Sequence, residues 1–221
     1  RVSAVLRELG VKPGDHVATL AWNSAAHIEV WYAIMGMGAI CHTLNPRLTG
    51  GQLAAMATLS GARVLIASAD LAPLAHQIAE AAPSLQRVLT IDGAAGGAEG
   101  LEPLIEAAGE SGVVWGAFPE TQPSGLCFTS GTTGAPKGVT YTHRSSYLHT
   151  LRLLQADVLA LTASDSVLAV VPMFHANAWG LPFAAPAAGA KLVLPGRATD
   201  GASLATLINA EQVTIAVGIA T

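Results

Sequence analysis

Short apolar runs alternate with longer segments of helical hydrophobic spacing along the first ninety residues. The apolar runs have the length of buried strands, and the segments between them repeat apolar residues as one face of a helix does. Strands separated by helices of this length imply a parallel sheet with helices on its faces, so we expect the α/β class. The expected strands cover 16–22, 39–44, 63–67 and 87–91, and the expected helices cover 1–10, 25–37, 49–60 and 71–81.

The pattern loosens between residues 92 and 120, where glycines at 93–97 predict a loop and 99–108 predict one short helix. We therefore place a junction here, between one partial α/β subdomain over 1–115 and another over 116–221. Further along the chain, the expected helices cover 144–160, 178–188 and 200–210, and the expected strands cover 166–171, 191–194 and 213–217.

Residues 128–138 are a polar segment rich in hydroxyls and glycines between two apolar runs. Its glycines allow positive φ, so that successive backbone N–H groups can converge on an anion. Pro136 stiffens the exit and directs Lys137, a compact positive charge, back toward the loop. The sequence therefore predicts a phosphate-binding loop with the candidate residues Thr129, Ser130, Gly131, Thr132, Thr133, Gly134 and Lys137.

The same composition also occurs in surface turns that bind nothing, which is the plainer interpretation of this segment. A Walker A loop is excluded, because Lys137 follows a proline and precedes Gly138-Val139 instead of opening a helix with Ser or Thr. The flanks 125–128 and 138–141 have strand character, so we expect the loop to join two antiparallel strands.

Charge and cysteine content exclude several classes of partner. The 221 residues carry 11 basic and 15 acidic side chains, a net charge of −4, and no basic stripe for nucleic acid. Cys41 and Cys127 are far apart and have no metal-ligand spacing, which favours a reducing cytoplasmic location. The uncharged run 166–190 contains His175, Asn177 and three prolines, so we expect no transmembrane segment. The start lacks a signal-peptide pattern and resembles a cut made inside a protein.

Two motifs carry a resemblance to a known family. The run T-S-G-T-T-G-A-P-K-G at 129–138 closely resembles the phosphate-binding signature of the adenylate-forming superfamily of acyl-CoA synthetases, luciferases and adenylation domains. The run V-P-M-F-H-A-N-A-W-G at 171–180 is similar to the segment that lines the acyl site of medium- and long-chain fatty acyl-CoA ligases. The resemblance implies layered, parallel-rich sheets that form part of the large N-terminal domain of such an enzyme, with its C-terminal lid domain outside the chain.

The resemblance also implies a reaction and a set of roles. A fatty or other carboxylic acid would react with ATP to give an acyl-adenylate, and coenzyme A would then form the thioester, as in an AMP-forming acid–thiol ligase. Lys137 and His175 would be catalytic, Thr129 would help to hold Mg²⁺, and Trp179 would be a gate for the acyl chain. His175 follows a strand, where ligands bind in open α/β sheets. Trp179 would lie one helical turn further, on the same face, if a helix has begun.

The resemblance covers less than half of a full enzyme. The segments that would bind adenine and ribose and the adenylation lysine lie outside the chain, so we expect these 221 residues alone to be inactive. An adenylation domain that loads an amino or aryl acid onto a carrier protein is one alternative, and a non-catalytic nucleotide-binding fragment is another. Related ligases can dimerise through their N-terminal domains, which leaves a homodimer open.

Overall fold

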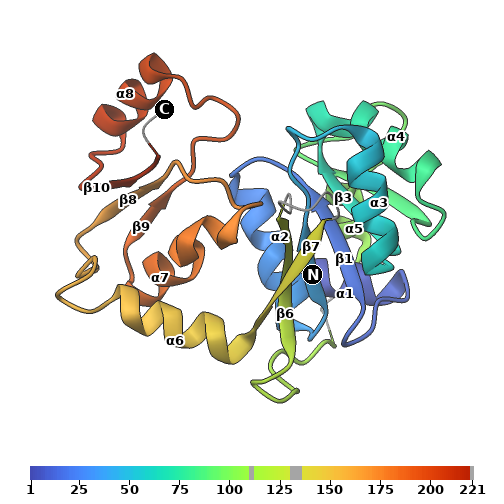
Figure 1. Cartoon of the computed structure of the whole chain (residues 1–221), viewed down its shortest axis with the longest axis horizontal. Coiled ribbons are helices and arrows are strands. Elements are labelled where there is room, and N and C mark those ends of the chain that lie inside the picture. The colour runs from blue at the N-terminus through green and yellow to red at the C-terminus, as the bar shows by residue number, and fades with distance from the viewer. Residues whose placement is uncertain (110–111, 130–135, 220–221) are drawn as a thin grey trace. The chain divides into compact units, whose positions relative to one another are not determined.

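The structure, a computed structural model, describes residues 1–109, 112–129 and 136–219 (Figure 1). The chain forms two compact units, and each is described by itself. The first unit contains Arg1–Ala21 and Ala26–Thr142, and the second contains Trp22–Ala25 and His143–Thr221. Each unit combines helices with a mainly or wholly parallel sheet, which confirms the α/β class.

The first unit is built on a seven-stranded sheet, counted over the residues that the structure describes, with the order β5-β4-β3-β1-β2-β6-β7. All neighbouring strands are parallel except β6 and β7, which are antiparallel. This pairing confirms the expected strands on either side of the polar loop. The strands are β1 (His16–Leu20), β2 (Ile40–Thr43), β3 (Val64–Ser68), β4 (Arg87–Ile91), β5 (Glu99–Gly100), β6 (Pro123–Thr129) and β7 (Lys137–Thr142).

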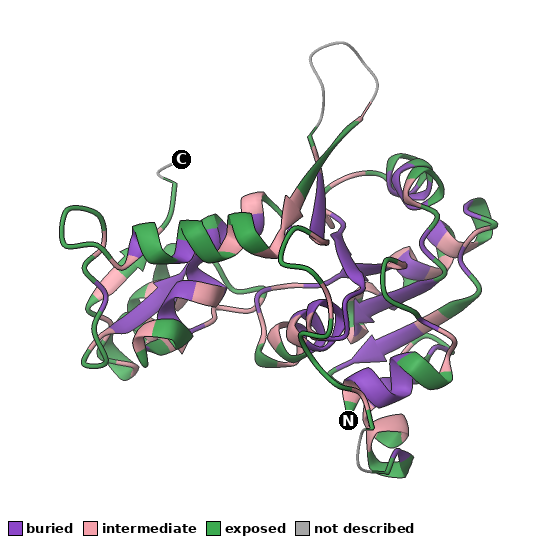
Figure 2. Cartoon of the chain, turned by 90° about the horizontal axis from the view of Figure 1, so that it is seen from below, coloured by how far each residue is buried: buried purple, intermediate pink, exposed green. Residues whose placement is uncertain are grey.

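Apolar spacing and capping explain the helices of this unit. In α3 the Thr49 side chain accepts a hydrogen bond from the Gln52 backbone while Gln52 reaches back, which is a capping box, and Gly61 ends the helix with φ of 68°. Leu53 and Leu65 are fully buried in the cluster that joins α3 and α4 to the sheet, and Figure 2 shows the inner strands as buried. The helices are α1 (Val2–Glu8), α2 (Ala25–Gly36, within the first unit from Ala26), α3 (Gly50–Ser60), the 3₁₀ turn η1 (Ala69–Leu71), α4 (Ala72–Ala81) and α5 (Leu101–Ala107).

The expected boundary at residue 115 and the observed division differ, because β6 hydrogen-bonds to β2 in the first sheet. Residues 116–142, which include the flanks of the polar loop, therefore group with the first unit and not with 143–221. Since β6 is parallel to β2, its last residue, Thr129, lies at the edge where the parallel strands have their carboxyl ends. Ligands of open α/β sheets bind at this edge.

The second unit has a three-stranded parallel sheet of described residues in the order β10-β8-β9. The chain passes from β8 to β9 on one side and then to β10 on the other, so the carboxyl end of β8 is a topological switch point. Asp200 caps α8 by accepting a hydrogen bond from the Ser203 backbone. The elements are α6 (His143–Leu153), β8 (Ser166–Ala169), the turn η2 (Ala176–Gly180), α7 (Leu181–Ala188), β9 (Lys191–Val193), α8 (Gly201–Ala210) and β10 (Ile215–Val217).

One helix is shorter than we expected from the sequence. We expected a helix over 144–160, but α6 ends at Leu153. The following turn folds back on the helix end, because the Leu159 N–H donates to the Leu153 carbonyl and Arg152 forms an exposed ion pair with Asp157 at 3.3 Å. Ala160 then adopts a φ of 49°, which a right-handed helix does not allow.

Over the described part of the chain, no helix combines the length and the apolar character that a membrane span requires. In the same residues, His, Cys, Asp and Glu side chains nowhere gather in the groups of three or more that would hold a metal ion.

Candidate functional site

The first unit contains one group of candidate residues, the pair Thr129 and Lys137, where β6 ends and β7 begins. The two residues lie directly opposite each other in the antiparallel ladder, and the Thr129 hydroxyl donates to the Lys137 carbonyl at 3.4 Å. Directly opposite residues of such a ladder project to the same face, and both side chains are exposed. A hydroxyl and an ammonium group therefore lie together at the carboxyl edge of the first sheet. The other predicted loop residues lie outside the described residues: Ser130, Gly131, Thr132, Thr133 and Gly134.

The strands below this pair are firmly packed. Phe128 lies against the ring of His42, with ring centroids 5.1 Å apart, and Cys127 Sγ lies 3.2 Å from the Thr43 hydroxyl. Gly138 itself is exposed, although an added Cβ would lie 3.0 Å from Leu126 Cδ1. The pair therefore follows a buried stretch of β6, Ser124–Cys127, whereas β7 is exposed from Lys137 to Thr140.

The buried titratable groups beneath the pair are unsuited to acid–base chemistry. Burial lowers the pKa of His42 to about 3, so its ring is neutral near pH 7, and its Nδ1 lies 2.9 Å from the Ser60 hydroxyl. Burial raises the pKa of the Cys41 thiol, which therefore stays protonated. Cys41 and Cys127 are both buried free thiols.

The second unit has its own group of candidate residues, in the segment that follows β8. The N–H groups of Val170 and Val171 both donate to the Val217 carbonyl, and Met173 and Phe174 are buried. His175 then emerges as an exposed residue with extended backbone, at φ of −129° and ψ of 123°. His175 therefore follows a strand, as the sequence predicted, and the structure adds that this strand ends at the switch point of the second sheet.

The turn after His175 is left-handed, which corrects one expectation. Ala176, Asn177, Ala178 and Trp179 have φ values of 45°, 52°, 48° and 54°, and the right-handed helix begins only at Leu181. Trp179 is therefore not one right-handed helical turn from His175. Gly180 at φ of 76° and Pro182 in the first turn of α7 explain where the right-handed helix starts. Left-handed geometry costs about 1–2 kcal/mol for each such residue, so the surroundings must hold this turn in place.

His149 of α6 supplies one such contact. Its Nε2 donates to the Trp179 carbonyl at 3.0 Å, and its ring occupies the space beside Gly180. The sequence indicated only a surface or structural histidine here, because nothing local to α6 points to a turn thirty residues further on. Asn23, expected only as the start of the next helix, also binds the segment that follows β8. Both contacts join residues far apart in the chain, which hydrophobic spacing cannot reveal.

The Gly180→Ala substitution is expected to destabilise the second unit by about 2–3 kcal/mol. Alanine is strained at the φ of 76° that Gly180 adopts, and its Cβ would also clash with the ring of His149. It would lie 2.6 Å from His149 Cδ2. Gly196→Ala is the matched control, since Gly196 also has positive φ, at 61°, but an added Cβ meets nothing within 4 Å. Urea unfolding should show the larger loss for Gly180→Ala and its partial recovery in the double variant with His149→Ala. Equal losses for the two glycines would mean that His149 does not confine Gly180.

The chain belongs to the AMP-binding enzyme family, whose pattern it matches over residues 1–221. Among curated relatives, it is 42% identical to the medium-chain-fatty-acid–CoA ligase of Ectopseudomonas oleovorans, covering 99% of this chain and 41% of the relative. It is 43% identical to the long-chain-fatty-acid–CoA ligase of Thermus thermophilus, covering 100% of this chain and 40% of the relative. The 3-methylmercaptopropionyl-CoA ligase of Ruegeria pomeroyi is 41% identical, with 100% and 42% covered. The chain thus spans about two fifths of the length of these relatives.

Solved structures agree with this assignment. A long-chain-fatty-acid-CoA ligase from Archaeoglobus fulgidus superposes with a TM-score of 0.86 at 25% identity, covering 97% of this chain and 42% of that one. The inhibitor-bound N-terminal domain of FACL13 from Mycobacterium tuberculosis gives a TM-score of 0.84 at 27% identity. This superposition covers 97% of this chain and 52% of that domain. The fold is therefore that of part of the N-terminal domain of adenylate-forming enzymes, as expected.

Proposed function

We propose that the whole protein is an AMP-forming ligase that activates a fatty acid with ATP and transfers it to coenzyme A. The observation that carries the proposal is the exposed Thr129–Lys137 pair at the carboxyl edge of the first sheet, in a chain of the AMP-binding family. The fatty acid is favoured over other acids because the medium- and long-chain-fatty-acid–CoA ligases are 42% and 43% identical over nearly the whole of this chain.

In the first half-reaction, a carboxylate oxygen attacks the α-phosphorus of ATP, the bond to the bridging oxygen breaks, and pyrophosphate leaves. Negative charge builds up on phosphoryl oxygens, so catalysis depends on positioned donors and positive charge. Lys137 offers an ammonium group and Thr129 a hydroxyl, both exposed on one face of the β6–β7 ladder. We infer that Ser130, Gly131, Thr132, Thr133 and Gly134 add further donors around the leaving pyrophosphate.

The chain's own residues fit Mg²⁺ in part. Mg²⁺ keeps several waters and takes one or two protein ligands besides substrate phosphates, so a single exposed hydroxyl such as that of Thr129 is compatible with it. When bound, Mg²⁺ would neutralise phosphate charge. We infer that the acidic ligand lies outside this chain; in the described residues, His, Cys, Asp and Glu form no group of three or more that could hold a metal ion.

We infer that His175 and Trp179 serve the acyl side of the reaction. His175 is exposed beyond the carboxyl end of β8, where a ligand of the second sheet would bind. Trp179 projects from the strained turn next to it, with 45% of its surface exposed. In this arrangement His175 would orient the reacting carboxylate, and Trp179 would open or close the path of the acyl chain.

The test uses a protein extended to the full length of the relatives. Exchange of labelled pyrophosphate into ATP is expected with medium- or long-chain fatty acids, followed by thioester formation when coenzyme A is added. Residues 1–221 alone are expected to give neither. Exchange only with amino or aryl acids, and transfer to a carrier protein, would establish the adenylation-domain alternative. Nucleotide binding without pyrophosphate exchange for any acid would favour the non-catalytic alternative.

The cytoplasmic location and the homodimer, both expected from the sequence, stay predictions.

A further inference from the structure

A buried asparagine binds the segment that leads to His175. Asn23 belongs to the short stretch of the second unit that precedes α2, and only 4% of its surface is exposed. Its Nδ2 donates to the carbonyls of Ala169 and Val171, each at 2.9 Å, and its Oδ1 accepts from the Met173 N–H at 2.8 Å. The side-chain amide thus makes three hydrogen bonds to alternate residues of the segment that begins at the end of β8.

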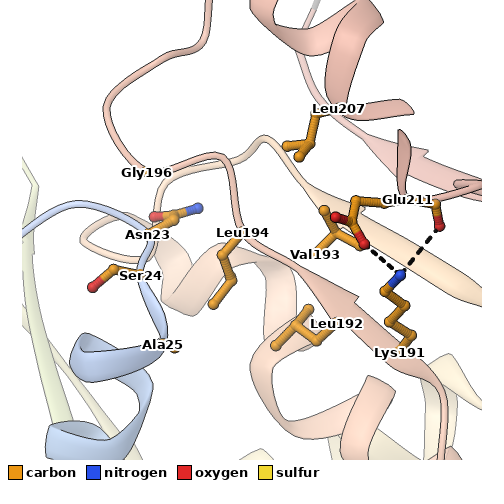
Figure 3. Close-up of a pocket in the computed structure, with 10 residues that line it drawn as sticks. All are labelled: Asn23, Ser24, Ala25, Lys191, Leu192, Val193, Leu194, Gly196, Leu207 and Glu211. Carbon is orange, nitrogen blue, oxygen red and sulfur yellow. Dashed lines mark hydrogen bonds and ion pairs between the residues drawn. The ribbon is translucent and has the colours of Figure 1, made fainter. Parts of the chain in front are cut away.

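The backbone of Asn23 is fixed as well. The Gly196 N–H donates to the Asn23 carbonyl at 2.9 Å, and the two residues form an isolated antiparallel bridge. Figure 3 shows Asn23 beside Gly196 and Leu194 in the lining of a pocket of about 370 Å³. Asn23 is therefore held in place independently of the segment that its side chain binds.

These bonds come at the place where regular pairing ends. Strand β8 finishes at Ala169, and the next two N–H groups both use the Val217 carbonyl. The side-chain amide of Asn23 binds the carbonyls of Ala169 and Val171 and the N–H of Met173. It thus replaces the hydrogen bonds that a neighbouring strand would supply. Only an amide offers two donors and an acceptor in this arrangement, since an ionised aspartate has no donor and serine is shorter.

We propose that Asn23 is a positioning residue that fixes the backbone of 169–173 and thereby the place of His175. The inference rests on the proposed function, in which His175 orients the carboxylate of the acid. His175 follows Met173 by two residues, and its N–H is bonded to the Pro172 carbonyl, so displacement of Met173 displaces His175. Misplacement of a reacting group by about 1 Å can cost about 10²-fold in rate.

The test compares the full-length enzyme with Asn23→Asp, which keeps the size of the side chain and removes its donors. Asn209→Asp is the matched control, because Asn209 is exposed on α8. In Asn23→Asp we expect kcat/KM for the fatty acid in pyrophosphate exchange to fall about 10²-fold, while KM for ATP stays within about twofold. Hydrogen exchange of the ligand-free protein should be at least about tenfold faster in the peptide 169–175, and unchanged in Asn209→Asp.

A second variant keeps the proposal testable if Asn23→Asp does not fold. Asn23→Ser is too short to make all three bonds but places no buried carboxylate against the carbonyls of Ala169 and Val171, so it is expected to give a smaller, parallel change in both readouts. Faster exchange at 169–175 with an unaltered kcat/KM for the acid would overturn the positioning role. Equal losses for ATP and acid together with a lowered melting temperature would overturn it as well, in favour of general support of the fold. The unsubstituted enzyme is assayed first. If it exchanges pyrophosphate with no acid, the proposed function itself is wrong, and this result is distinct from any effect of the variants.

Discussion

The Lys137→Ala substitution in the full-length protein is expected to slow adenylate formation by about 10²–10³-fold, the scale for loss of one positioned donor to the transition state. Lys137 is exposed at the start of β7, where its ammonium group contributes little to packing. The free energy of unfolding should therefore change by less than about 0.5 kcal/mol. Single-turnover formation of the adenylate and a thermal melt measure the two effects.

Lys12→Ala serves as the control, since Lys12 is another exposed lysine of the first unit. It should leave both the rate and the melting temperature at the level of the unsubstituted protein. If Lys137→Ala exchanges pyrophosphate at the parental rate and melts at a much lower temperature, Lys137 is structural, and its proposed role is wrong.

The Trp179→Ala substitution is expected to let fatty acid bind in the absence of ATP while costing little stability. The physical basis is the exposure of Trp179, whose surface is 45% accessible. The absence of a side chain at Gly180 does not leave the indole room to move, because His149 fills the space beside this glycine. Freedom of the indole therefore has to come from its solvent-facing side. Calorimetry of fatty-acid binding with and without a nonhydrolysable ATP analogue checks the prediction.

Trp31 provides the comparison for a packed tryptophan. It is fully buried in α2 and makes an edge contact with His27, with ring centroids 5.7 Å apart. Trp31→Ala should cost about 3–5 kcal/mol of unfolding free energy and leave the order of binding unchanged. If Trp179→Ala is destabilised as strongly as Trp31→Ala and still requires ATP for binding, Trp179 is a core residue and not a gate.

Local signals predicted most elements of this fold. The Thr49 and Gln52 capping box, the glycine at 61 and the apolar repeat between them specify α3 within the sequence itself. The pairing of β6 with β2 was not predictable in this way, since it joins segments about eighty residues apart. The expected subdomain boundary and the observed units differ for this reason.

Candidate site residues could be predicted from the sequence only where they belong to a motif of consecutive residues. Thr129, Lys137 and His175 could be named from their motifs. The left-handed turn at 176–179 could not be predicted, because Ala176 and Ala178 have no intrinsic preference for positive φ. Contacts with residues far away in the sequence, such as His149, hold the turn in this conformation. Asn23 was equally hidden, since its partners lie about 150 residues away.

The division of the second unit between residues 22–25 and 143–219 affects the order in which the protein is made and folded. Asn23 leaves the ribosome with the first strand and helix, but Met173 is synthesised 150 residues later. Closing so long a loop costs entropy that local helices do not incur, so this contact should form after them. Expression of residues 143–221 alone would leave the carbonyls of Ala169 and Val171 without the asparagine amide. A split protein would therefore need to carry Trp22–Ala25 with its second half, for example through circular permutation.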